Sequence, residues 1–173
     1  IATGYKNELI DEFIKKKFKK HNIKTIYTGI NSDIIVRLEK ISKHSNNNFL
    51  VCYGDTMLDI DLNNYIKFYL ENKKKILVAS YQLKSSFGIL DIKKNNEVVN
   101  FKEKPKLDIW FNIGYFMFSF DKFHYFKKFN QFKKLLKFLS KNKLMKAYKH
   151  TGKHITINTV SELEIAKQQI KKF

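Results

Sequence analysis

The stretch FLVCYGDTMLDIDLNNYIKFYLENKKKILVASY, residues 49–81, contains the pattern that decides the fold class. It opens with a continuous apolar run from Phe49 to Tyr53, typical of a strand that is covered on both faces in a parallel sheet. Asp61 then stands where a helix cap is expected, and the helix should reach about Asn72. A second apolar run follows from Ile76 to Tyr81. Strand, helix and strand in this order predict a βαβ unit.

The residues before this stretch show the same alternation. Apolar residues recur at helical spacing from Asn7 to Lys20, and again from Ser32 to Ser42, where Asn31 or Ser32 is the expected cap. Lys24 to Tyr27 is a short strand between the two helices, and the first residues read like the end of another strand. Repeated β and α segments predict a mostly parallel sheet with right-handed crossovers.

After Phe87 the pattern changes to strands without intervening helices. Gly88 to Ile92 and Val98 to Lys102 flank a turn, and a longer apolar strand runs from Trp110 to Phe118. The remaining expected elements are one or two helices at Asp121 to Lys141, strands at Leu144 to Lys149 and His154 to Ile157, and a helix at Ser161 to Lys172. We therefore expect an α/β protein with a Rossmann-like, mixed, mostly parallel sheet flanked by helices, as a single domain over residues 1–173.

The composition describes an ordered protein without a membrane span. The 173 residues are 43% hydrophobic and include one proline and six glycines, which excludes a disordered or low-complexity chain. No stretch approaches the roughly 18 apolar residues that a span needs, so we expect no membrane partner. The only cysteine, Cys52, cannot form an internal disulfide; we expect a packed core thiol and a cytoplasmic location.

The net charge of +18 raises the possibility of a nucleic-acid partner. However, Arg37 is the only arginine among 34 basic residues, whereas nucleic-acid recognition draws heavily on the planar guanidinium. Lysine, asparagine, isoleucine and phenylalanine are abundant together, which is typical of a composition bias of the whole genome. We expect no nucleic-acid partner, and a basic nucleic-acid binder stays as the alternative that charge alone supports.

Asp55 is the first candidate site residue. It follows Gly54 directly after the buried strand, and the carboxyl ends of parallel strands carry loops that face one crevice. A carboxylate there suits Mg²⁺, which binds one or two protein carboxylates together with phosphate oxygens and water. The alternative is a simple turn followed by a cap.

Two further candidates come from later strands. Glu103 and Lys104 precede Pro105 at a strand end, where Lys104 could bind a phosphate and Glu103 could accept hydrogen bonds from sugar hydroxyls. An exposed ion pair is the alternative for these two. Asn112 interrupts an apolar run together with Gly114, and its partner is either a ligand or the backbone.

Four motifs in this order resemble those of a known family. They are Tyr53-Gly-Asp55, Phe87-Gly-Ile-Leu-Asp91, Val98-Val-Asn-Phe-Lys-Glu-Lys-Pro105 and Asn112-Ile-Gly-Tyr-Phe116. The chain resembles the sugar-1-phosphate nucleotidyltransferases, most closely the glucose-1-phosphate cytidylyltransferase type. The resemblance runs from Ile1 to the last helix, and the joint order of the motifs is more specific than any one of them.

The resemblance implies a reaction and a role for each candidate. An oxygen of a sugar-1-phosphate attacks the α-phosphorus of an NTP, which releases pyrophosphate and gives an NDP-sugar. Asp55 would hold Mg²⁺, Lys104 would bind the sugar phosphate, and Glu103 would bind sugar hydroxyls, while Gly88 and Asn112 would line the sugar pocket. The expected partners are an NTP and a sugar-1-phosphate, with a homo-oligomer as a possibility.

The sequence departs from the family pattern in three places. The Gly-rich loop that clasps the NTP phosphates, and the first βα unit with it, come before the point that corresponds to Ile1, so we expect a chain that lacks them. The nucleotide-contacting loop corresponds to Asn31–Arg37, but Ile35 and Val36 stand at its glycine positions. A second metal-binding aspartate corresponds to Asn158, which could be a weaker ligand because it has no charge. These departures keep open a catalytically silent, sugar-phosphate-binding module of the same fold.

Overall fold

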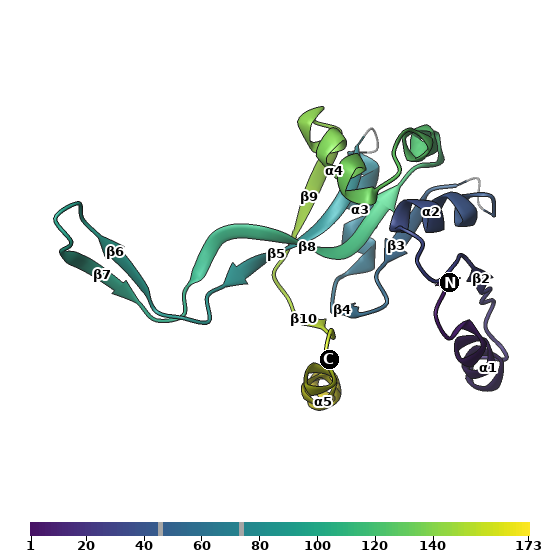
Figure 1. Ribbon diagram of the computed structural model, residues 1–173, viewed down its shortest axis with the longest axis horizontal. Coiled ribbons are helices and arrows are strands. Elements are labelled where there is room, and N and C mark those ends of the chain that lie inside the picture. Colours follow the sequence, from purple (N-terminus) through teal and green to yellow (C-terminus); the bar gives the residue numbers. More distant parts are fainter. Residues whose placement is uncertain (45–46, 73–74) are drawn as a thin grey trace. The chain divides into compact units, whose positions relative to one another are not determined.

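The computed structural model describes residues 1–44, 47–72 and 75–173. The chain divides into two compact units, Ile1–Phe49 with Phe118–Met145 and Leu50–Met117 with Lys146–Phe173. Figure 1 labels the helices and strands of both. All six candidate site residues belong to the second unit. The expectation of a single domain over residues 1–173 stays a prediction.

The first unit contains a short parallel sheet and a group of helices. Its elements are β1 (Ala2–Thr3), α1 (Asn7–Lys17), β2 (Ile26–Tyr27), α2 (Ile34–Ser42), the 3₁₀ helix η1 (Phe120–Lys128) and α4 (Phe132–Lys141). β1 and β2 pair in parallel, as expected from the alternating pattern. Buried apolar side chains of α2, η1 and α4 form its interior: Ile35, Leu38, Phe126, Phe132, Leu135 and Leu139.

The cap of α2 differs from the expected one. Asp33, rather than Asn31 or Ser32, is the N-cap, because its Oδ1 accepts a hydrogen bond from the Ile35 amide at 3.0 Å. The same oxygen accepts a bond from the amide of Phe132, the first residue of α4, at 2.9 Å. One carboxylate therefore satisfies a free N–H at the start of two helices.

The second unit carries the larger sheet and the candidate site. Its elements are β3 (Phe49–Cys52), β4 (Thr56–Leu58), α3 (Leu62–Glu71), β5 (Ile76–Lys84), β6 (Ile89–Ile92), β7 (Val98–Lys102), β8 (Lys106–Phe118), β9 (Met145–His150), β10 (His154–Thr156), α5 (Val160–Gln169) and the 3₁₀ helix η2 (Ile170–Lys172). Asp61 caps α3 as expected, through a bond from the Asn64 amide at 3.0 Å. The sequence pattern did not reveal β4.

The α/β class with a mixed sheet and flanking helices is confirmed. The four-stranded sheet has the order β3-β8-β5-β9, so β8 lies between β3 and β5. β8 runs antiparallel to β5, with Tyr81 opposite Phe111 and Leu77 opposite Met117. The local sequence pattern does not reveal this position of β8, because a strand that comes later in the chain inserts between the two strands of the expected βαβ unit.

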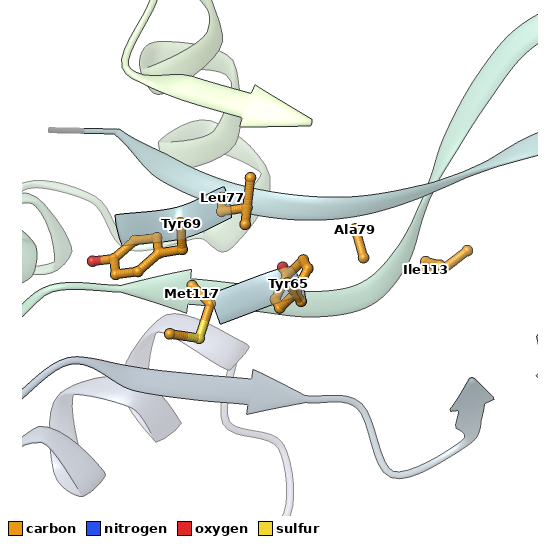
Figure 2. Packing of buried hydrophobic residues seen from close by; sticks show 6 residues of the cluster. All are labelled: Tyr65, Tyr69, Leu77, Ala79, Ile113 and Met117. Carbon is orange, nitrogen blue, oxygen red and sulfur yellow. The ribbon is translucent and has the colours of Figure 1, made fainter. Parts of the chain in front are cut away.

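The core of the second unit forms where α3 covers the sheet. Figure 2 shows Tyr65 and Tyr69 of α3 beside side chains of β5 and β8, all of them buried: Leu77, Ala79, Ile113 and Met117. The Tyr65 hydroxyl donates to the Tyr115 carbonyl at 3.1 Å, so the buried polar atom has a partner. Burial raises the pKa of Tyr65 far above its ordinary value.

Cys52 corrects another expectation. It ends β3 and is exposed, so the expectation of a packed core thiol is wrong. Partial desolvation nevertheless raises the pKa of the thiol, and this effect outweighs a hydrogen bond with Tyr115. A raised pKa leaves little thiolate near neutral pH and makes Cys52 a poor nucleophile.

None of the helices in the described ranges has the length and apolar content that crossing a bilayer requires.

Candidate functional site

Asp55 and Asn158 lie at the same end of a short antiparallel ladder. β4 pairs with β10, with Thr56 opposite Thr156. One residue further along, the Ile157 amide donates to the Asp55 carbonyl at 2.9 Å. Asp55 and Asn158 are both exposed. The ladder thus sets Asn158 one residue beyond the partner of Asp55, although about a hundred positions separate the two residues in the sequence.

Local contacts hold each of these two residues in place. The Thr56 hydroxyl donates to Oδ1 of Asp55 at 3.2 Å. Beside Asn158, Oε2 of Glu162 accepts hydrogen bonds from the backbone amides of Asn158 at 2.5 Å and Thr159 at 3.0 Å. Thr159 in return caps α5 by accepting the Glu162 amide, which completes a capping box. The bond from the Asn158 amide is the main reason that the pKa of Glu162 lies below its ordinary value.

The donor atoms at this end of the ladder fit Mg²⁺. A carboxylate and a side-chain amide oxygen are hard ligands, and Mg²⁺ is bound through one or two carboxylates with water and substrate phosphates as its other ligands. Within residues 1–44, 47–72 and 75–173, no group of three or more His, Cys, Asp or Glu side chains is arranged to hold a metal ion.

Gly88, Glu103 and Lys104 come together at the base of the β6–β7 hairpin. A Cβ at Gly88 would lie 3.3 Å from Oε2 of Glu103 and 2.5 Å from the Phe101 ring, so only glycine leaves this approach open. Nζ of Lys104 lies 3.9 Å from Oε1 of Glu103, and both side chains are more than half exposed. This is the exposed ion pair that the sequence left open as the alternative, and such a pair adds little stability. Both charges are also accessible to a ligand.

The backbone of Lys104 is unusual. Its φ is +43°, in the left-handed region, although Lys104 carries a side chain and precedes Pro105. This conformation costs about 1 kcal/mol or more and persists only where the surroundings fix it. The Ser85 amide fixes the turn by donating to the Pro105 carbonyl at 2.9 Å. Strained backbone of this kind clusters at binding sites, which supports a ligand-binding role for Lys104.

Asn112 has the backbone partner that the sequence left as an alternative. Its Oδ1 accepts the Gly114 amide at 2.8 Å. Gly114 has φ +76°, and a Cβ there would lie 2.7 Å from the Tyr53 ring. Asn112 thus stabilises an irregular segment of β8 that permits close contact with Tyr53. The residue is exposed, so its amide group is accessible as well.

Arg37, at the end of the expected nucleotide-contacting loop, is bound within the first unit. Nε donates to the Ser32 carbonyl at 3.1 Å. Nη1 and Nη2 donate to four further oxygens: Thr3 O (3.2 Å), Thr28 Oγ1 (2.7 Å), Gly29 O (3.2 Å) and Ile30 O (3.3 Å). A guanidinium has five N–H donors, so these bonds account for all of them. The side chain thus joins β1 to the loop that follows β2.

The structure thus forms two groups of candidate residues in the second unit. Asp55 and Asn158 form one, and Gly88, Glu103 and Lys104 form the other. No hydrogen bond or ion pair among the described residues joins the two groups. The sequence reading missed Glu162, although the pattern Thr-x-x-Glu from Thr159 to Glu162 predicts a capping box and could have indicated it.

Comparison with known proteins identifies the family. The family model described as Nucleotidyl transferase matches residues 3–159, which is most of the chain and includes part of both units. This chain belongs to the nucleotidyl transferase family. The resemblance inferred from the four motifs is confirmed.

Similar proteins in this family act on glucose 1-phosphate, as their names state. The chain is 31% identical over 107 residues to a glucose-1-phosphate cytidylyltransferase of Salmonella typhimurium, a match that covers 60% of this chain and 41% of the relative. It is 28% identical over 85 residues to a glucose-1-phosphate adenylyltransferase of Mycoplasma mobile, covering 47% of the chain and 22% of that relative. The matched stretches therefore span less than half of these curated relatives.

Solved structures support the fold. The chain resembles the crystal structure of a UDP-glucose pyrophosphorylase complexed with UDP-glucose, with a TM-score of 0.68 and 17% identity over all of this chain and 80% of that one. At this identity the likeness shows the α/β nucleotidyltransferase fold alone.

Proposed function

We propose that the protein containing this chain is a sugar-1-phosphate nucleotidyltransferase. In the reaction, an oxygen of the sugar 1-phosphate forms a bond to the α-phosphorus of an NTP. The bond from that phosphorus to the β-phosphate oxygen breaks, and pyrophosphate leaves with its electron pair. The hydrogen bond between Ile157 and Asp55 is the observation that supports the proposal most, because it sets Asn158 one residue beyond the partner of Asp55 at an exposed strand end.

In this proposal Asp55 and Asn158 hold Mg²⁺ through a carboxylate and an amide oxygen. The ion, when bound, supplies positive charge close to the phosphates. By fixing the position of the ion, Asp55 and Asn158 would determine where the phosphate groups lie relative to the sugar 1-phosphate, and alignment of this kind provides much of the rate in phosphoryl transfer. The capping box at Thr159 and Glu162 fixes the backbone of Asn158 for this purpose.

The base of the hairpin binds the sugar 1-phosphate. Nζ of Lys104 binds the phosphate as a point charge, and the Glu103 carboxylate accepts hydrogen bonds from sugar hydroxyls. The backbone of Gly88 and the amide of Asn112 line the same pocket. The exposed charges of Glu103 and Lys104 and the strained backbone of Lys104 support these roles.

We propose glucose 1-phosphate and CTP as the substrates. The 31% identity to a glucose-1-phosphate cytidylyltransferase supports this choice, and the adenylyltransferase match makes ATP the competing nucleotide. We further propose that residues 1–173 act as one nucleotidyltransferase domain in the cytoplasm, where a free thiol such as Cys52 stays reduced.

The direct test is pyrophosphate release by the protein encoded by the complete reading frame that contains this sequence. Glucose 1-phosphate and Mg²⁺ are supplied with CTP, ATP, UTP or dTTP in separate reactions. The proposal expects turnover, highest with CTP. Turnover that is highest with another NTP keeps the reaction class and overturns the choice of base, whereas no turnover with any NTP overturns the activity.

A second candidate function rests on Asn158 and Arg37. An uncharged residue stands at the second metal position, and every donor of Arg37 is bound within the protein. Both observations favour a catalytically silent module that binds a sugar phosphate. Calorimetry distinguishes the two, since the silent module would bind glucose 1-phosphate without binding any NTP, and turnover excludes it.

A further inference from the structure

Asp59 holds the end of the β4–β10 ladder that lies away from the proposed metal site. It directly follows β4, and its amide donates to the Lys153 carbonyl at 3.3 Å, which continues the ladder beyond the pair of Leu58 and His154. Its Oδ1 accepts a hydrogen bond from the Lys153 amide at 2.6 Å. Asp59 is thus joined to Lys153 through its backbone and through its side chain.

His150 adds a contact from the end of β9. The side chain is 6% exposed, and its Nε2 lies 3.0 Å from the Lys153 carbonyl and 3.1 Å from Oδ1 of Asp59. Both neighbours are acceptors, so Nε2 carries a hydrogen and donates to them. Asp59, His150 and Lys153, which we call the turn clasp, therefore join the end of β4 to the turn between β9 and β10 (Figure 1).

Gly152 and Tyr81 fit the turn around the clasp. A Cβ at Gly152 would overlap the Asp59 carboxylate and lie 2.8 Å from Cε1 of His150, so only glycine permits this close approach. The Tyr81 hydroxyl donates to the Gly152 carbonyl at 3.0 Å, and the centroid of its ring lies 5.2 Å from that of His154. The turn is therefore anchored to β5 as well as to β4, which fixes the point where β10 begins.

β10 depends on such an anchor because it is short and belongs to a small sheet. It has three residues and pairs with β4 in a two-stranded sheet. A two-stranded sheet is marginally stable by itself. A slip of β10 by two residues would carry Asn158 about 7 Å along β4, away from its place one residue beyond the partner of Asp55.

Given the function proposed above, in which Asp55 and Asn158 hold Mg²⁺, we propose that Asp59 is a positioning residue for this site. The turn clasp fixes the register of β10 and with it the position of Asn158. In this role Asp59 supplies an acceptor oxygen to the turn, and its charge is not required. Residues that support metal ligands in this indirect way commonly contribute a factor of about 10 to 100 in metal affinity.

Titration with Mn²⁺, followed by electron paramagnetic resonance of the free ion, tests the proposal on the protein encoded by the complete reading frame. Asp59→Ala removes the acceptor, and Asp59→Asn keeps an acceptor oxygen without the charge. We expect the dissociation constant for Mn²⁺ to rise about tenfold or more in Asp59→Ala and to stay close to the natural value in Asp59→Asn. An unchanged constant in Asp59→Ala, or an equal rise in both variants, would overturn the proposal.

Asp61→Ala is the matched control for a loss of stability alone. Asp61 lies two positions further along the chain and caps α3 by accepting the Asn64 amide. Its replacement should lower the midpoint of urea denaturation while the dissociation constant for Mn²⁺ stays at the natural value. A rise for Asp61→Ala equal to that for Asp59→Ala would be a general effect of destabilisation and would contradict the positioning role.

Hydrogen exchange of the Ile157 amide separates failure of the positioning role from failure of the proposed function. This amide donates to the Asp55 carbonyl, so its protection reports the register of the ladder without any metal. We expect the protection to fall further in Asp59→Ala than in Asp61→Ala. Equal protection in the two variants overturns the positioning role alone, whereas a natural protein that binds no Mn²⁺ overturns the metal site and the positioning role together.

His150→Phe keeps the test decisive if Asp59→Ala fails to fold. Phenylalanine keeps a ring at the end of β9 and removes the Nε2 donor to Asp59 and Lys153. We expect weaker Mn²⁺ binding and lower protection of the Ile157 amide in this variant. Natural values of both would refute the role of the turn clasp.

Discussion

The carbonyl of Asp55 accepts a hydrogen bond from the amide of Ile157 at 2.9 Å. This bond extends the β4–β10 ladder by one step and leaves the Asp55 carboxylate and the Asn158 amide at the same exposed strand end. The proposed metal site therefore depends on a pairing between the first strand-end motif of the chain and its last strand.

Replacing Asn158 by aspartate should strengthen metal binding. A second carboxylate beside Asp55 adds a negative charge near the cation, and charges a few ångströms apart near a surface interact by about 1–4 kcal/mol. We expect the affinity for Mn²⁺, used as a paramagnetic substitute for Mg²⁺, to rise at least about tenfold. Electron paramagnetic resonance of free Mn²⁺ measures this without any assay of activity.

The control for Asn158→Asp is Asn130→Asp, which adds the same charge at an exposed position of the first unit. That variant should leave Mn²⁺ affinity unchanged. If both variants bind Mn²⁺ as the natural protein does, Asn158 is not at a metal site.

Glu162 should make the stability of the α5 N-terminus depend on pH. Its pKa in the folded protein lies below the ordinary value, chiefly because its carboxylate accepts the Asn158 amide. A lowered folded-state pKa gives stabilisation that is present above the unfolded-state pKa, about 4.3, and is lost as pH falls through the folded-state value. We expect the protection of the Asn158 and Thr159 amides against hydrogen exchange, measured relative to the intrinsic exchange rate at each pH, to fall over that acid range.

Glu162→Gln should remove this acid-dependent change, because glutamine does not titrate. Glu164→Gln is the matched control on the same helix, since Glu164 pairs only with Lys167 among the described residues. It should keep the natural pH profile. Identical profiles for Glu162→Gln and the natural protein would refute the role of the capping box in holding Asn158.

Arg37 should stabilise the fold without contributing to nucleotide binding. Arg37→Lys keeps the charge but cannot make five bonds in a planar arrangement, so we expect a loss of about 2 kcal/mol in the free energy of unfolding. Urea denaturation measures the loss. The KM for the NTP should change little, and a rise of about tenfold or more with unchanged stability would show that Arg37 contacts the nucleotide instead.

Periodicity and caps predicted most elements of the fold from the sequence. The helix capped by Asp61, the hairpin of β6 and β7, and the strand of Trp110 to Phe118 all form where expected. The insertion of β8 between β3 and β5 could not be predicted from local pattern, because strand order depends on contacts between distant segments. β4 was missed for a related reason: three residues are too few to show a period.

Part of the candidate site could likewise be predicted from the sequence, and part could not. Asp55, Glu103 and Lys104 are predicted from motifs at strand ends, and Asn158 is predicted from the family resemblance; their roles stay predictions. The position of Asn158 one residue beyond the partner of Asp55 is visible only in the strand pairing of the structure. The hydrogen bonds of Arg37 to carbonyl oxygens are likewise visible only in its side-chain geometry. The cap at Asp33 was missed because Asn31, Ser32 and Asp33 are all good cap residues in adjacent positions.

Pyrophosphate release from an NTP and glucose 1-phosphate, measured for Asp55→Asn and for Asp108→Asn, tests whether Asp55 belongs to the active site. Both variants replace one exposed carboxylate of the second unit by an amide, but only Asp55 lies at the β4–β10 strand end. We predict that Asp55→Asn lowers kcat/KM by a factor of about 100 or more, while Asp108→Asn keeps the natural rate. Full activity of Asp55→Asn would contradict the assignment of this site.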